Sequence, residues 1–224
     1  MTDEIQRGAA QVCFDATPLI LFADAGVLST LTTWFGPLAY TAAVVTEVEL
    51  KKNLEGHPQN REILKLPWLH SVPLEEDDDL RFVADLRRLW GSKTGRDHGE
   101  AEVVALGRRF GWTVVIDDRA GRDAARSNGV PCVSTAGMIA ASVAGVYESV
   151  EQAWQLYSQV SANHDRPIFP VRDEYRSAFE ATTNGIKRIA EQMPDQIWPH
   201  LLADQRIDAL LGRAASKRRQ ELGK

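Results

Sequence analysis

The chain has 224 residues, of which 44% are hydrophobic and 25% are charged, and its 26 Lys and Arg against 31 Asp and Glu give a net charge of −5. This composition is that of a folded globular protein and excludes a collagenous, coiled-coil or mostly disordered chain. Because the net charge is negative, the chain as a whole has no positive field that attracts nucleic acid or an anionic membrane. Any such contact must therefore be local. Cys13 and Cys132 stand alone in apolar runs, which argues against a disulfide framework or a zinc site.

The first residues contain no apolar core of the kind that a signal peptide needs. The charge-free run 130–147 approaches the length of a membrane span, but Pro131 and several small polar residues interrupt it. We interpret this run as a buried strand followed by a helix of small residues. We therefore expect no membrane span and a cytoplasmic location.

Apolar and amphipathic segments alternate through the first two thirds of the chain. A strand at 12–14 is followed by a helix through 19–22, for which Thr17 is the predicted N-cap and Pro18 the first-turn proline. The other predicted strands are 38–40, 69–72, 113–116 and 131–133, and the other helices are 27–35, 42–53, 75–90, 99–110, 121–128 and 137–144. This alternation predicts an α/β sandwich with a parallel sheet.

From about Glu148 the pattern predicts helices alone, at 150–160, 173–193 and 197–211. We interpret 1–147 as one domain and 148–224 as a helical C-terminal extension that packs on the domain or on a partner. Apolar residues of the extension recur at near-helical spacing and need such a surface: Leu156, Phe179, Ile186, Ile189, Ile197, Leu201 and Leu210.

Charge differs between the two parts, with −6 over residues 1–150 and +1 over 151–224. The basic cluster at the end of the chain consists of Arg213, Lys217, Arg218, Arg219 and Lys224. It is either a solvated helix end or a contact to an RNA backbone or a partner protein. If it binds RNA, neutralising its charges should flatten the salt dependence of RNA affinity.

Two acidic residues follow predicted strands, at the edge of a parallel sheet where ligands bind. Asp15 comes directly after the first strand, and Asp117 follows the strand at 113–116. A carboxylate in this position is costly unless it is paired, caps a helix or binds a cation. Asp15 has the alternative role of an N-cap, and Asp117 that of a turn residue, with Asp118 as its rival.

Two further acids lie on predicted helices. Glu47 occurs in a strongly apolar stretch, whereas Glu49 on the same helix is expected at the surface. Glu100 follows Asp97 by three residues, so the two share a helix face. A capping box, with Asp97 as N-cap and Glu100 closing it, is the alternative interpretation of that pair.

Residues near the predicted strand ends supply candidate substrate contacts. Arg122 could hold a phosphate, or it could form an ion pair with Asp118 or Asp123. Ser134 and Thr135 follow the last strand and could donate to a phosphate or a carboxylate, or cap the next helix.

Several rival phosphate chemistries lack their motifs. Thr17 stands where a haloacid-dehalogenase-like phosphatase needs its second Asp, and a receiver domain would need paired acids after its first strand. The sequence contains no GxGxxG after the first strand and no GxxxxGK[ST], so dinucleotide-binding and P-loop functions lack their phosphate cradles. A GxSxG nucleophile elbow is also missing.

Four acidic blocks, in order, resemble the PIN-domain family over about residues 10–147: CFDATPLILFADAG, TAAVVTEVE, GEAEVVALG and VVIDDRAGRDAARSNGVPCVSTAG. The chain looks most like the bacterial, toxin-like ribonuclease branch that carries a GEAE motif. The resemblance implies a three-layer α/β/α sandwich with a central parallel sheet and a metal-dependent ribonuclease activity. The acids that it places at the carboxyl end of the sheet are Asp15, Glu47, Glu100 and Asp117, with Asp97 and Asp118 as substitutes.

Carboxylates that converge without imidazole or thiolate suit Mg²⁺ or Mn²⁺ rather than zinc. We expect Asp15, Glu47 and Asp117 to contact the metal, and Glu100 to bind a second ion or to orient the attacking water. The resulting hypothesis is an endoribonuclease that acts on RNA as the toxin of a toxin–antitoxin pair. An antitoxin protein and a second copy of the chain are candidate partners. The alternative is a PIN-fold RNA- or protein-binding module without catalysis.

Overall fold

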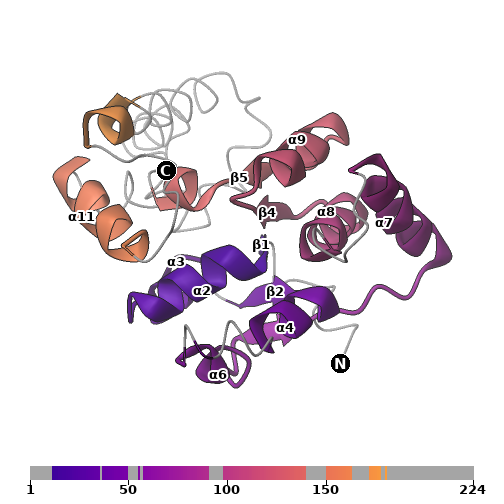
Figure 1. Cartoon of the computed structure of the whole chain (residues 1–224), viewed down its shortest axis with the longest axis horizontal. Coiled ribbons are helices and arrows are strands. Elements are labelled where there is room, and N and C mark those ends of the chain that lie inside the picture. Colours follow the sequence, from indigo (N-terminus) through magenta and orange to yellow (C-terminus); the bar gives the residue numbers. More distant parts are fainter. Residues whose placement is uncertain are drawn as a thin grey trace, which may run out of the picture. The chain divides into compact units, whose positions relative to one another are not determined.

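The computed structural model describes residues 12–35, 37–49, 55, 58–90, 98–139, 150–162, 172–177 and 180. Its helices and strands, all but β3 labelled in Figure 1, are β1 (Val12–Phe14), α2 (Ala16–Asp24), α3 (Ser29–Phe35), β2 (Leu38–Tyr40), α4 (Ala42–Glu49), α6 (Asn60–Ile63), β3 (Leu69–Ser71), α7 (Asp77–Leu89), α8 (His98–Phe110), β4 (Thr113–Val115), α9 (Arg119–Ser127), β5 (Cys132–Val133) and α11 (Val150–Val160). The chain divides into two compact units, Met1–Thr135 and Ala136–Lys224.

The strands of the first unit form a five-stranded sheet in the order β3-β2-β1-β4-β5, and each described pairing is parallel. Helices cover both faces, with α8 and α7 on one side of the strands and α2 and α3 on the other (Figure 1). The predicted α/β sandwich with a parallel sheet is confirmed.

The central strands are apolar because helices bury both of their faces. Cys13 and Phe14 of β1 and Val114 and Val115 of β4 are all fully buried. Polar side chains begin where these two strands end, at Asp15 and at 117. The change from apolar to acidic sequence therefore marks the carboxyl edge of the sheet.

Helix α8 packs so closely against the sheet that a side chain at Gly107 has no room. A Cβ there would lie 2.5 Å from Val130 Cγ1 and 2.6 Å from Val114 Cγ1. Contacts under 3 Å require the backbone or its neighbours to shift, which costs about 1–3 kcal/mol in a packed core.

We predict that Gly107→Ala destabilises the protein, because this crowding exceeds the roughly 1 kcal/mol that alanine gains over glycine in a helix. Urea unfolding should show a lower midpoint for Gly107→Ala. Ser127→Ala, at an exposed helical position, is the control and should stay within about 0.5 kcal/mol of the parent. A Gly107→Ala protein as stable as the parent would show that α8 does not pack this tightly.

Some predicted boundaries were wrong. Thr17 is not the N-cap of α2, because the helix begins at Ala16 and Asp15 takes the cap position with an extended backbone (φ −72°, ψ 167°). Pro18 is then the third helical residue, where its missing N–H costs nothing. The short helix α6 was not predicted.

Several predictions lie outside the described residues. They concern Asp97, the helix at 197–211, the basic cluster, and most of the helices at 137–144 and 173–193.

Within the second unit, α11 packs against residues 172–177 through aromatic rings. Tyr157 and Tyr175 stack with their ring centroids 4.9 Å apart, and Trp154 lies 5.6 Å from Tyr175. Arg172 and Arg176 both pair with Glu151 at the surface. Of the apolar residues predicted to pack, Leu156 is half-buried, and the others lie outside the described residues.

In the described part of the chain, no helix has the length and apolar character that a membrane span requires.

Candidate functional site

The strand order places a topological switch point between β1 and β4. The chain leaves β1 toward β2 on one side and later returns to β4 on the other side of β1. Ligands of parallel α/β sheets bind at such a switch point, outside the carboxyl ends of the strands. Asp15 follows β1 directly and its backbone N–H donates to Val115 O at 3.1 Å, which fixes it beside the end of β4.

Asp15 occupies the N-cap position of α2 without serving as a cap. Its side chain makes no capping hydrogen bond, only 2% of the residue is exposed, and Oδ1 has no hydrogen-bond partner among the described residues. A buried carboxylate oxygen without a donor is costly. The capping alternative therefore does not explain why an acid stands here.

Asp117 and Asp118 have different roles although they are adjacent. Asp118 is exposed and caps α9, since its Oδ1 accepts from Gly121 N at 3.1 Å. Asp117 is half-buried, and Thr135 donates to both of its oxygens, from the backbone N–H to Oδ1 and from Oγ1 to Oδ2, each at 2.7 Å. Thr135 thus fixes the orientation of the Asp117 carboxylate.

Glu47 and Glu100 reach the same region from helices α4 and α8, which pack against each other. Gly99 of α8 lies close to two of the acids, because a Cβ there would lie 3.1 Å from Asp15 Oδ1 and 3.4 Å from Glu47 Oε2. Gly121 of α9 has the same relation to Glu100, with its Cβ position 3.3 Å from Glu100 Cβ. Glycine at these two positions lets the helices bring their acids against the strand ends.

The electrostatics of Asp15 show that each of the other three acids lies close enough to act on it. Its pKa lies well above the ordinary value, first because the carboxyl is buried and then because Glu100, Glu47 and Asp117 repel a further negative charge. A hydrogen bond from the Ala16 N–H acts in the opposite direction and is outweighed. The structure therefore brings together Asp15, Glu47, Glu100 and Asp117, the acids that were singled out from the sequence.

The donor set suits a hard cation, although the side chains do not enclose one as they stand. In the described ranges, no three Asp, Glu, His or Cys side chains are grouped closely enough to hold an ion. Mutual repulsion keeps ionised carboxylates apart unless a cation lies between them. The buried Oδ1 of Asp15 and the raised pKa of its carboxyl are the two observations that fit a cation at this place.

Neither cysteine offers a thiolate to such a site at neutral pH. Burial raises the pKa of the Cys13 thiol strongly, and Asp15 and Glu102 raise it further. Burial also raises the pKa of Cys132 to about 11, against the opposing effect of Arg126 and Arg122. The ligands available at the strand ends are therefore carboxylate oxygens, which favour Mg²⁺ or Mn²⁺.

Arg122 adopts neither of the ion pairs considered for it. Its Nη1 donates to the backbone carbonyls of Ile116 (3.3 Å) and Asp117, while Asp123 pairs with Arg119 and Arg126. Arg122 thus braces the loop that carries Asp117. Ser134 is half-buried at the end of β5, next to Thr135.

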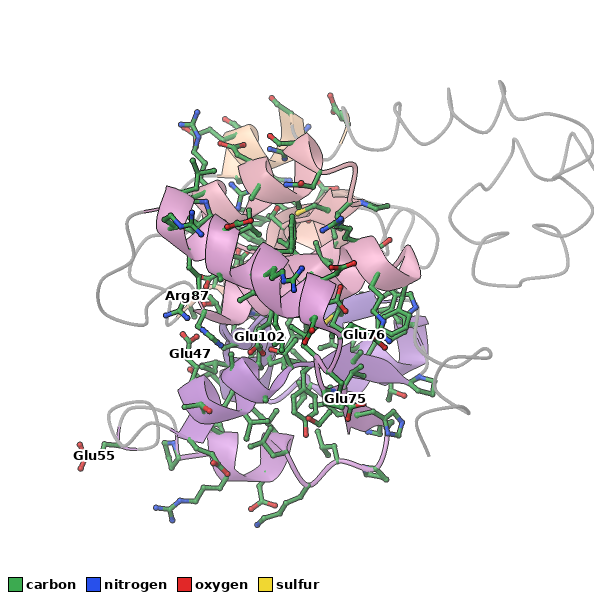
Figure 2. All side chains as sticks on the ribbon, turned by 90° about the vertical axis from the view of Figure 1, so that its right-hand side faces the viewer. Glu47, Glu55, Glu75, Glu76, Arg87 and Glu102 are labelled. Atoms are coloured by element: carbon green, nitrogen blue, oxygen red, sulfur yellow. The ribbon has the colours of Figure 1, made fainter. Side chains whose placement is uncertain are left out.

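Sequence reasoning missed Glu102, the second acid of GEAE. Its Oε2 accepts from Ala43 N of α4 at 3.0 Å, and its Oε1 lies 2.8 Å from His98 Nε2. Figure 2 shows Glu102 and Glu47 on the same side of the molecule, with Glu55 pointing away from the body. The sequence signal that could have identified Glu102 is its spacing from Glu100. An acid two residues after Glu100 lies on a different side of the helix from Glu100.

A model of the PIN-domain family matches residues 11–156 of the chain. This range covers the whole described sheet, the four acids and the first helical turns of α11. The chain therefore belongs to the PIN-domain family. No curated protein and no solved structure matches the chain. The fold is thus that of a nuclease-type family, and a hydrolase of phosphodiester bonds is the coarse class that the family supports.

Proposed function

We propose that the chain is a metal-dependent endoribonuclease. The observation that carries this proposal is Asp15, a buried carboxylate at the sheet's switch point that caps no helix and is repelled by three other acids. Such an arrangement lowers stability unless a cation is bound, so its presence in a PIN domain supports a catalytic role. Within a PIN domain, Mg²⁺ or Mn²⁺ is the cation that these oxygens suit.

Asp15, Glu47 and Asp117 would hold the cation. When bound, Mg²⁺ or Mn²⁺ supplies positive charge that stabilises the scissile phosphate and lowers the pKa of a coordinated water. Thr135 donates to both Asp117 oxygens and so restricts the orientation of this carboxylate. Glu100 would orient the attacking water or hold a second ion, and Arg122 and Ser134 are the proposed substrate contacts.

The direct test is incubation of the purified protein with total RNA and Mn²⁺, followed by mapping of the new RNA ends. We expect discrete ends that appear with Mn²⁺, disappear with EDTA and are missing with Asp15→Asn. Intact RNA under all conditions would contradict an endoribonuclease.

A PIN-fold binding module without catalysis is the second candidate. It is favoured by one observation, that no three described acids stand close enough to hold an ion as placed. The same incubation separates the two functions, because a binding module would retard RNA or a partner protein in a native gel without producing new ends.

A role as the toxin of a toxin–antitoxin pair follows the resemblance to toxin-like PIN proteins. Its test is expression in bacterial cells, where the parent should arrest growth and Asp15→Asn should not. A small neighbouring reading frame whose product binds the chain and restores growth would identify the antitoxin. Growth unaffected by the active parent would contradict the toxin role without contradicting ribonuclease activity.

Thr135→Val should weaken the site while leaving its ligands in place. Valine has the shape of threonine but loses the Oγ1 donor to Asp117 Oδ2, and the backbone donor to Oδ1 remains. Partners of this kind typically change metal affinity or activity by about 10–100-fold. Mn²⁺ titration should show weaker binding for Thr135→Val and parental binding for Thr135→Ser, which keeps the hydroxyl. Equal affinities in all three proteins would show that Thr135 does not support the site.

A further inference from the structure

The N-terminus of helix α4 has a backbone N–H donor, at Ala43, that no acidic side chain of the helix itself binds. The first turn of α4 contains no acidic residue, and the donor at Ala43 is instead bound by Glu102 of α8, 59 residues later in the chain. Thr41, which precedes the helix, accepts from Val44 N through its Oγ1 at 3.4 Å. The cap of α4 is therefore shared between a local hydroxyl and a carboxylate from another helix.

The Glu102 carboxylate is well placed for this role. Its side chain is only 13% exposed, and its other oxygen is engaged by His98, one turn earlier on α8. Both oxygens thus have a partner, which restricts the rotation of the carboxylate. A negative group at a helix N-terminus is also favoured by the helix dipole, and partial burial strengthens that interaction.

The two helices that Glu102 joins are the ones that carry the helical acids. Glu47 lies one turn after Ala43 on α4, and Glu100 lies two residues before Glu102 on α8. Gly99 of α8 has its Cβ position only 3.4 Å from Glu47 Oε2, so α4 and α8 are in contact at this level. A displacement of the α4 N-terminus from α8 would carry Glu47 away from Asp15 and Glu100.

We propose that Glu102 is a positioning residue, which clamps the N-terminus of α4 to α8 and thereby sets the distance from Glu47 to the other acids. This inference rests on the proposed function, because it assigns Glu102 a role in assembling that same cation site. Glu102 itself touches neither the cation nor the substrate. Its own bond to the Ala43 N–H keeps it out of the ligand set.

The experiment compares Glu102→Ala and Glu102→Gln with the parent in two readouts, neither of which is cleavage. The first is hydrogen exchange of the Ala43 amide, followed by NMR. The second is Mn²⁺ affinity, measured by the EPR signal of the free ion. Glutamine keeps an oxygen that can accept from Ala43 N but loses the charge, so it separates the clamp from a simple charge effect.

We expect Glu102→Ala to speed exchange at Ala43 by tenfold or more and to weaken Mn²⁺ binding by about 10–100-fold. Glu102→Gln should remain within threefold of the parent in both readouts. Leu69→Ala removes a buried side chain of edge strand β3 and serves as a destabilised control. It should lower the thermal midpoint and leave Mn²⁺ affinity unchanged, which separates lost stability from lost positioning.

Two results would overturn the clamp. In one, the Ala43 amide of Glu102→Ala exchanges its hydrogen at the parental rate, or Glu102→Ala binds Mn²⁺ with the parental affinity. In the other, Glu102→Gln is as impaired as Glu102→Ala, which would show that charge rather than the bond to Ala43 matters. A parent that binds no Mn²⁺ at all is a different failure, since it would overturn the proposed function and the role of Glu102 with it.

Discussion

Asp15→Asn should reduce RNA cleavage on the order of 100-fold or more, the effect of losing one preorganised electrostatic contact at a reacting centre. Asn preserves the shape of the side chain but removes the charge that would hold a cation at the carboxyl ends of β1 and β4. The measurement is the initial rate on a mapped RNA substrate at saturating Mn²⁺. Asp117→Asn should behave in the same way.

Helix α4 offers a matched pair for this test. Glu47 is half-buried and close to Gly99, whereas Glu49 is exposed two residues later. Glu47→Gln should lower the rate strongly, and Glu49→Gln, with the same change in net charge, should leave it within about twofold of the parent. Equal rates for Glu47→Gln and Glu49→Gln would remove Glu47 from the site, and full activity of Asp15→Asn would refute the site as a whole.

The same Asp15→Asn substitution should stabilise the protein in EDTA. The pKa of the Asp15 carboxyl is raised by burial and by Glu100, Glu47 and Asp117, so the folded protein holds this proton more tightly than the unfolded chain. The stabilisation from the proton is fully present below the unfolded pKa, near 3.8, and is lost as the pH rises through the folded pKa. Each tenfold difference in proton affinity corresponds to about 1.4 kcal/mol.

Urea unfolding in EDTA from pH 4 to pH 8 measures this effect. The parent should lose stability toward pH 8 relative to Asp15→Asn, and the two curves should converge at low pH, where the carboxyl is neutral. Because Glu100, Glu47 and Asp117 all act on the Asp15 carboxyl, the transition belongs to the cluster rather than to Asp15 alone. Mn²⁺ at a hundredfold excess over its Kd should then stabilise the parent by about 2.7 kcal/mol and the variant by much less. Parallel pH curves would contradict a buried, repelled Asp15.

The architecture could be predicted because the central strands are apolar on both faces and end at acids. Asp15 and Asp117 were predicted at the sheet edge for that reason. The start of α2 was predicted wrongly because Thr17-Pro18 is a typical N-terminal pair, and sequence alone does not show that Asp15 adopts the extended cap geometry. Helix α6 has four residues, too few for a periodic pattern to appear.

The acids of the candidate site were predictable from the sequence as a group near the strand ends, whereas the contacts that support them were not. Asp15, Glu47, Glu100 and Asp117 stand out by their apolar surroundings, and the structure places the other three within electrostatic reach of Asp15. The bonds from Thr135 to Asp117 and from Ala43 to Glu102 join segments that are 18 and 59 residues apart. Such bonds depend on how β4, β5, α4 and α8 pack, which no local pattern specifies.

The most direct test of the central claim, that the carboxylates at the strand ends form a cation site, is Mn²⁺ affinity measured by EPR on the parent and a set of single variants. We predict weaker binding in each of Asp15→Asn, Glu47→Gln and Asp117→Asn. Glu100→Gln should lose the second Mn²⁺ ion if Glu100 holds one, and should bind as the parent does if Glu100 orients the water. Glu49→Gln and Asp118→Asn, which keeps a good helix cap, should bind as the parent does. A parent without Mn²⁺ affinity, or six variants that all bind like the parent, would contradict the claim.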